Sequence, residues 1–179
     1  MRKLLIFIFL STSIVLPGFS AKVELKAGYF MPSEKAFRDV YGSGPIAGAE
    51  IEFKLFGPLN LYIEGNYFNK NGKLTYTLEN TRLMIIPAGA GLRVNINRGG
   101  ITKYIGCSVR YYRYYESNPI GSVNASSAGV GGNVGGHFRI NKWLCLDLRL
   151  SYFYCKMKPV FFEFNIGGIE LGGGLVLNF

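Results

Sequence analysis

The sequence predicts an all-β fold, an eight-stranded antiparallel up-and-down transmembrane β-barrel. Apolar and polar residues alternate along segment after segment, which is typical of strands with one apolar and one polar face. No segment after the amino-terminal region approaches the roughly 18 consecutive apolar residues of a membrane-spanning helix. Yet 49% of the residues are hydrophobic and 15% are aromatic, and 24 are glycine. Many short strands account for such a composition.

The amino-terminal segment, residues 1–20, has the features of a secretory signal peptide. Arg2 and Lys3 form a basic start, an apolar run follows, and Pro17-Gly18 ends it. Small residues before the expected cleavage point place it after Ser20 or Ala21. Residues 21–179 are then expected to form the barrel as one domain.

Alternation predicts the strands in chain order at residues 22–30, 45–56, 59–67, 82–96, 101–115, 127–140, 144–154 and 165–179. Longer connections are expected at 31–44, 69–81, 116–126 and 156–164, and short turns at 57–58, 97–100 and 141–142. This regular exchange of long and short connections is typical of a transmembrane barrel with both termini periplasmic.

Three local features refine these elements. Pro87 interrupts the fourth strand and predicts a β-bulge there. Ser33 is a candidate cap for a short helix that carries Phe37 and Tyr41 on one side. Residues 74–78 could extend the hairpin between the third and fourth strands.

The seventh strand shows the predicted faces best, because Leu144, Leu146, Leu148 and Leu150 alternate with polar residues. Aromatic residues also gather near the strand ends, as they do at membrane interfaces. A soluble lipocalin-like barrel would place the apolar parity inside instead. The signal peptide, the aromatic residues and the final Phe179 favour the membrane.

The chain resembles small outer-membrane β-barrel proteins of the OmpW and OmpA-barrel kind, and the "outer membrane protein beta-barrel domain" groups. The resemblance runs from LKAGYF at Leu25 to LVLNF at Phe179. It implies a place in the bacterial outer membrane, with outer-membrane lipid and lipopolysaccharide as partners. It also implies that the barrel-assembly machinery reads Phe179 as an assembly signal.

The inward parity carries charges of both signs. Its members are Glu24, Lys26, Glu50, Glu52, Lys54, Glu64, Arg93, Arg110, Arg139, Asp147, Arg149 and Glu170. Isolated charges in a narrow lumen are costly, so acids and bases are expected to pair. Since side chains fill the interior of an eight-stranded barrel, the pairs predict a plug rather than a pore.

No catalytic, metal-binding or cofactor-binding motif is found. Lipid A deacylases use a His, a Ser two residues later and a Glu, but His137 is followed at that distance by Arg139. A hydrogen-bonding role for His137 in the lumen is therefore favoured. The three cysteines lack metal-site spacing. Pairing of Cys107 with either of the other two remains open.

The favoured function is a structural or surface-binding role of a monomeric barrel without catalysis. The alternative is an OmpW-like conduit for small hydrophobic compounds, with a ligand pocket lined by Phe37, Tyr112, Tyr114, Phe161 and Phe162. A lipid A-modifying hydrolase is the least favoured function. The net charge of +9 falls to about +7 without Arg2 and Lys3 and is spread along the chain, which argues against nucleic-acid binding.

Overall fold

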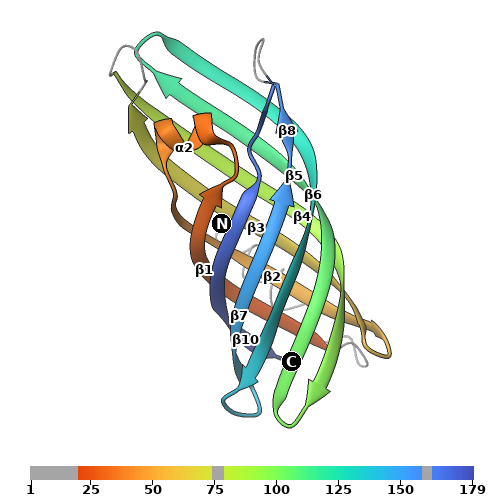
Figure 1. Cartoon of the computed structure of the whole chain (residues 1–179). Helices are drawn as coiled ribbons and strands as arrows, with labels where there is room; N and C mark the ends of the chain where they lie inside the picture. Colours follow the sequence, from red (N-terminus) through yellow and green to blue (C-terminus); the bar gives the residue numbers. More distant parts are fainter. Residues whose placement is uncertain (1–19, 74–78, 159–162) are drawn as a thin grey trace, which may run out of the picture.

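The computed structural model describes residues 20–73, 79–158 and 163–179, which form a closed antiparallel β-barrel (Figure 1). Around the wall the strands follow the order β1, β10, β7, β6, β5, β4, β3, β2. Each strand thus pairs with its neighbours along the chain, and the first strand pairs with the last. This confirms the predicted fold class.

In the described part of the chain the wall consists of β1 (Ala21–Pro32), β2 (Gly44–Phe56), β3 (Leu59–Lys73), β4 (Asn80–Arg98), β5 (Ile101–Asn118), β6 (Gly121–Arg139), β7 (Leu144–Tyr154) and β10 (Gly168–Asn178). A short helix, α2 (Lys35–Tyr41), follows β1, and the two-residue strands β8 (Lys156–Met157) and β9 (Phe164–Asn165) form a small hairpin. No helix among the described residues is long and apolar enough to cross a membrane.

The two ends of the barrel differ. Three short turns and the carboxy-terminus lie at one end, called here the turn end (Figure 1). Gly57, Gly99 and Gly100 in these turns have φ values of 54°, 59° and 87°, a region that glycine enters without steric cost. The helix α2 and the tip of the β5–β6 hairpin lie at the opposite end, called the loop end.

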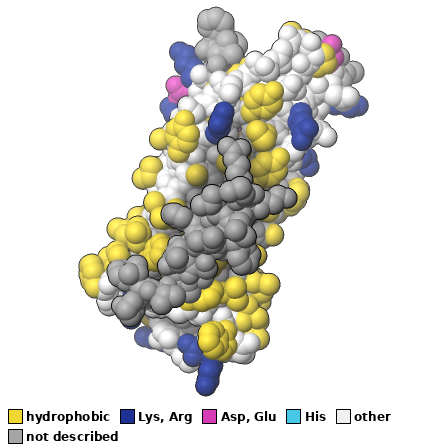
Figure 2. Space-filling view, turned by 180° about the vertical axis from the view of Figure 1, so that it is seen from behind, with side chains coloured by type: hydrophobic (Ala, Val, Ile, Leu, Met, Phe, Trp, Pro, Cys, Tyr) yellow, Lys and Arg dark blue, Asp and Glu magenta, His cyan; other side chains and the backbone are white. Residues whose placement is uncertain are grey.

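The outer wall is apolar, as the alternation predicts. Leu146, Leu148 and Leu150 on β7 are 41%, 53% and 48% exposed, whereas Asp147 and Arg149 between them are buried. In Figure 2 apolar side chains lie over the visible wall, and Lys and Arg side chains lie toward the two ends. An outward apolar band with a polar interior is the arrangement of a membrane-spanning barrel.

Exposed aromatic rings mark both ends of this band. They include Tyr29, Tyr67, Tyr111, Tyr152 and Tyr154 toward the loop end and Phe56, Phe138, Trp143 and Phe179 toward the turn end. Tyrosine and tryptophan rings combine an apolar body with a polar group, and aromatic rings of this kind gather at the two interfaces of a bilayer.

Glycines on the inward face make room for large side chains. Gly91 stands opposite Tyr62 on β3, and Gly135 stands opposite Tyr104 on β5. A Cβ at either glycine would lie 2.6 Å from the Cζ atom of the facing tyrosine. The rings can therefore lie flat against the wall only because these two positions lack side chains.

The connection between the fifth and sixth strands is not the expected loop at 116–126. β5 and β6 stay paired as far as Asn118 and Gly121, and only two residues form the turn. The Asn118 Oδ1 atom accepts hydrogen bonds of 3.0 Å from the backbone N–H groups of Ile120 and Gly121. Polar residues occur here because the hairpin projects beyond the apolar band, not because the strands have ended.

The predicted bulge at Pro87 is also wrong. Pro87 pairs with Tyr112 in an unbroken register on one side. On the other side the β3–β4 pairs pass from Gly65–Ala88 to Phe68–Ile85 without a shift. A local gap in the ladder is enough to accommodate a residue without an N–H group, so no extra residue is needed.

At the start of α2, Ser33 does not act as the helix cap. Its Oγ atom donates to the Gly167 carbonyl at 3.2 Å, and the N-cap position is Glu34, which makes no side-chain capping bond. Phe37 and Tyr41 are buried on the inner side of the helix, as predicted. The signal peptide up to residue 19 and the possible extension at 74–78 lie outside the described residues.

Candidate functional site

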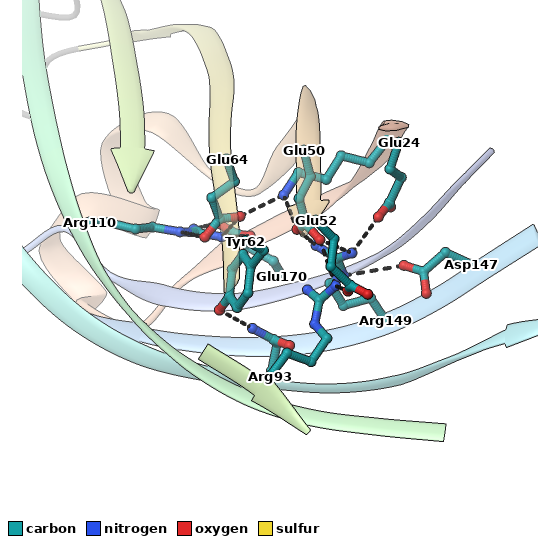
Figure 3. A network of polar contacts seen from close by, with 12 residues as sticks. Glu24, Glu50, Glu52, Tyr62, Glu64, Arg93, Arg110, Asp147, Arg149 and Glu170 are labelled. Atoms are coloured by element: carbon teal, nitrogen blue, oxygen red, sulfur yellow. Dashed lines mark hydrogen bonds and ion pairs between the residues drawn. The ribbon is translucent and has the colours of Figure 1, made fainter. Parts of the chain in front are cut away.

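A network of ion pairs fills the middle of the lumen (Figure 3). The strands bring together Glu24, Lys26, Glu50, Glu52, Glu64, Arg93, Arg110, Asp147, Arg149 and Glu170. All of them belong to the predicted inward set. Most are buried to within a few per cent, so each pair exchanges contact with water for contact with an opposite charge.

Arg93 lies at the centre of the network. Its Nη1 atom donates to Glu50 Oε1 at 2.6 Å and to Glu52 Oε2 at 2.8 Å. The rings of Tyr62 and Tyr104 stack on its guanidinium group, each with its centroid 4.3 Å from Cζ. Arg93 Nε and Nη2 have no hydrogen-bond partner among the described residues, and the ring faces lie against the group instead.

Arg149 connects carboxylates from three strands. Its Nη2 atom lies 2.6 Å from Glu24 Oε2 and its Nη1 atom 2.6 Å from Glu50 Oε2. Its Nε atom lies 3.2 Å from Asp147 Oδ2 and donates to the Tyr104 hydroxyl at 3.0 Å. The Tyr104 hydroxyl in turn donates to Asp147 Oδ1 at 2.7 Å. Both β1 and β2 are thereby tied to β7 across the lumen.

Arg110 forms the part of the network nearest the loop end. It holds Glu64 with two hydrogen bonds, of 2.7 Å and 2.9 Å, and Glu170 with two, of 2.6 Å and 3.2 Å. Its guanidinium Cζ lies 3.2 Å from the centroid of the Phe153 ring. Lys26 Nζ joins this part to the rest, because it lies 2.6 Å from Glu64 and 3.5 Å from Glu50.

Two residues of the predicted set do not join the network. Lys54 and Arg139 are exposed and line an open cavity of about 470 Å³ at the turn end. They share the inward parity of their strands but lie too close to the mouth of the barrel to be enclosed. The prediction that Lys54 and Arg139 belong to the lumenal charge network was therefore wrong.

Other members of the network were not in the predicted set. Lys22 pairs with Glu52 at 2.7 Å, and Asn133 donates to the Tyr62 hydroxyl at 2.6 Å. Tyr104 is hydrogen-bonded on both sides, as described above. All of these lie on the inward parity, so a search that included Lys22 at the start of the first strand and the inward tyrosine and asparagine side chains would have found them.

An apolar cluster closes the lumen above the charges. It contains Phe30, Phe37, Tyr41, Ile46, Phe68, Leu83, Ile85, Tyr112, Tyr114, Phe153, Cys155, Met157 and Ile166. A cavity beside Phe68 and Tyr112 measures only about 10 Å³. This is too small for a hydrophobic ligand, since it holds at most about one water molecule.

The residues proposed for a ligand pocket lie in this cluster rather than around an opening. Phe37, Tyr112 and Tyr114 are 5%, 3% and 2% exposed and pack with their neighbours. Phe161 and Phe162 lie outside the described residues. Nearby, Tyr41 in α2 shares a 3.2 Å hydrogen bond with Thr81, and burial raises the pKa of its hydroxyl above the ordinary value.

Three further predicted features have definite positions. Phe179 is 51% exposed at the turn end, and its N–H donates to the Ala21 carbonyl at 3.0 Å, next to the β1–β10 seam. Cys107, Cys145 and Cys155 are all free thiols, so the disulfide that the sequence left open is not formed. His137 is buried in the lumen, with its ring 4.9 Å from that of Tyr104, but the hydrogen bond predicted for it is not made by its Nε2 atom, which has no partner among the described residues.

Solved structures share this architecture. The structure of Neisserial surface protein A matches 90% of this chain and 97% of its own, with a TM-score of 0.63 and 18% identity. The chain has the fold of small outer-membrane β-barrels. In that fold, OprG from Pseudomonas aeruginosa matches 90% of this chain and 95% of its own, with a TM-score of 0.63 and 11% identity. For E. coli outer membrane protein W the shares are 89% and 97%, the TM-score 0.57 and the identity 11%.

These likenesses concern the fold. No protein-family model matches the sequence, and no characterised protein matches it at the sequence level. The function must therefore be argued from the residues of this chain.

Proposed function

We propose that this protein is a closed, non-enzymatic barrel of the bacterial outer membrane with a structural or surface-binding role. The observation that carries the proposal is the double obstruction of its lumen. A layer of paired charges is followed toward the loop end by the packed apolar cluster. In the proposed orientation both termini are periplasmic and the loop end faces outward.

The charged layer is costly to open. Arg93 and Arg110 are each 1% exposed and each binds two carboxylates. Separating a buried charge from its partners typically costs about 3–5 kcal/mol. An ion pathway would require several such pairs to break together, so thermal opening would be rare.

Conductance in planar bilayers tests the closed state. The refolded protein should give no steady current, and the variant Arg93→Ala/Arg110→Ala, if it inserts, should give more leakage than the wild type. Large, regular single-channel steps from the wild type would refute the closed lumen and indicate a pore.

Location is tested separately. The apolar outer band and its aromatic ends support insertion into a bilayer. The mature protein should therefore be recovered in the outer-membrane fraction as a monomer and migrate differently on gels before and after boiling. Recovery from the periplasm without detergent would contradict the membrane location. Truncation of Phe179 should slow assembly if the assembly machinery reads this residue.

Lipopolysaccharide is the partner that we propose for the outer surface. Arg113 is exposed on the outer face of β5 toward the loop end, beside a surface cavity of about 300 Å³ that Asn124 and Ser126 also line. Anionic head groups attract such side chains by about 1 kcal/mol each near a membrane surface. Arg113→Ala should therefore weaken lipopolysaccharide binding more than Lys103→Ala, which removes an exposed charge from the turn end of the same strand.

The conduit for hydrophobic compounds has less support. It would need a route through the apolar cluster, where Phe37, Tyr112 and Tyr114 are buried. Co-purification of a fatty acid or detergent inside the upper barrel would favour it over the closed barrel.

A further inference from the structure

One group of buried side chains, at the edge of the charged network toward the turn end, has polar atoms that the network leaves without hydrogen bonds. Glu24 on β1, His137 on β6 and Asp147 on β7 each offer one ligand atom, and these three atoms lie within 4.8 Å of one another. The residues are 3%, 3% and 0% exposed. His137 and Asp147 are paired across the β6–β7 hairpin, and closure of the barrel through β1 and β10 brings Glu24 beside them.

Each of the three residues has a buried polar atom without a hydrogen bond. Glu24 Oε1, His137 Nε2 and Asp147 Oδ2 lack hydrogen-bond partners in the part of the chain that the structure describes. Buried polar atoms are normally paired, so three such atoms in one place call for an explanation. Arg149 contacts Glu24 through the other oxygen, Oε2, at 2.6 Å, and its Nε lies 3.2 Å from Asp147 Oδ2 as an ion pair without forming a hydrogen bond.

Positive charge is also in deficit near these three residues. The enclosed network contains six carboxylates, and the basic residues paired with them are Lys22, Lys26, Arg93, Arg110 and Arg149. Glu64 and Glu170 face Arg110 and Lys26, while Glu50 and Glu52 face Arg93 and Lys22. Glu24 and Asp147 have Arg149 as their basic partner, which Glu50 also contacts, so one negative charge is left over when His137 is uncharged.

We propose that Glu24, His137 and Asp147 bind a divalent transition-metal cation of the Zn²⁺ type. Zinc binds imidazole nitrogens and carboxylate oxygens, and three protein ligands can leave a fourth position open. Two ligand atoms on a tetrahedral zinc ion stand about 3.4 Å apart. His137 Nε2 already lies 3.5 Å from Asp147 Oδ1, the oxygen that also accepts the Tyr104 hydroxyl. A hydroxide or chloride ion in the open position would bring the whole network to neutrality.

The surroundings supply both an entry route and supporting contacts. His137 lines the turn-end cavity of about 470 Å³ and also a cavity of about 10 Å³ that it shares with Glu24. The ion can therefore approach from the turn end without crossing the plug. Arg149 and the Tyr104 hydroxyl hold the carboxylates from behind, as outer contacts of metal ligands commonly do.

The test uses the full barrel in detergent micelles, produced without a histidine tag. Because His137 is the only histidine in the chain, protein labelled with ¹³C at the histidine Cε1 position gives a single NMR signal from this site. Addition of ZnCl₂ should move this signal to a new position that saturates at one ion per chain. A signal that stays in place under excess Zn²⁺, while the barrel remains folded, would overturn the proposal.

Variants then identify the ligands. Glu24→Gln and His137→Gln should each weaken Zn²⁺ binding at least roughly tenfold in calorimetric titrations. Glu163→Gln, which changes a half-exposed carboxylate at the loop end, should leave binding unchanged. Folding of every variant is checked by its migration on unheated gels. Equal binding by Glu24→Gln and the wild type would assign the ion to another place and refute the site, and the NMR result does not depend on any variant.

Discussion

Arg110 offers the sharpest test of the charged network. Its side chain is 1% exposed. It forms ion pairs with Glu64 and Glu170 and stacks on the Phe153 ring. In Arg110→Ala, Glu64 keeps Lys26 at 2.6 Å, but Glu170 loses its partner. We therefore expect a loss of about 3 kcal/mol in the free energy of unfolding, the low end of the range for breaking a buried pair.

The assay is a urea titration in detergent that contains no lipopolysaccharide, followed by the fluorescence of Trp143, the single tryptophan. With an m-value of about 1–3 kcal/mol per molar, the midpoint should fall by about 1–3 M. The matched control is Arg113→Ala, the same substitution at an exposed position of the same strand, which should cost less than about 1 kcal/mol.

A second variant separates charge from packing. In Arg110→Ala/Glu170→Ala the carboxylate that was left alone is removed as well, so part of the lost stability should return. If Arg110→Ala costs no more than Arg113→Ala, the network does not stabilise the barrel. If the double variant is as unstable as the sum of its single changes, the pair is not coupled.

Three other expectations concern the wall, the interior and the thiols. Leu148→Arg should destabilise the barrel in lipid by about 2–4 kcal/mol if it lies near the midplane, whereas Ile120→Arg at the exposed hairpin tip should have little effect; equal costs would show that the assigned faces are wrong. Gly135→Ala should cost about 1–3 kcal/mol because its Cβ would meet a tyrosine ring, while Gly65→Ala, with nothing within 4 Å, should be tolerated in the same titration. A water-soluble maleimide should label all three cysteines after unfolding without reductant, and fewer than three labels on the unfolded chain would indicate a disulfide. In the folded barrel the two buried thiols should stay unlabelled, and lipid should shield Cys107.

Alternation along the sequence was enough to predict the strands and their faces. It could not give the depth of a side chain in the lumen, because period-two patterning carries no information along the barrel axis. Lys54 and Arg139 show this limit: their parity is inward, yet they lie at the mouth. The same pattern also gave no sign that β5 and β6 continue past the apolar band.

The contacts across the lumen could not be predicted from the sequence, for a different reason. Which inward residues face one another depends on the stagger and closure of the barrel. The stacking of Tyr62 and Tyr104 on Arg93 follows from that geometry, as does the meeting of Glu24 with His137. Charge of both signs inside the wall was predictable, but the partners were not.

The charged network also has a consequence for assembly. A strand that slides by two residues keeps every apolar side chain outside, so the apolar pattern alone accepts the error. Sliding β10 in this way against its neighbours would carry Glu170 about 7 Å along the barrel and away from Arg110. A similar shift of β1 or β2 would separate Glu24 or Glu50 from Arg149. These partners are 125 and 99 residues away from Arg149 in the chain. The ion pairs therefore help to specify the register in which the barrel closes, because only the correct stagger of the strands leaves every buried charge with a partner.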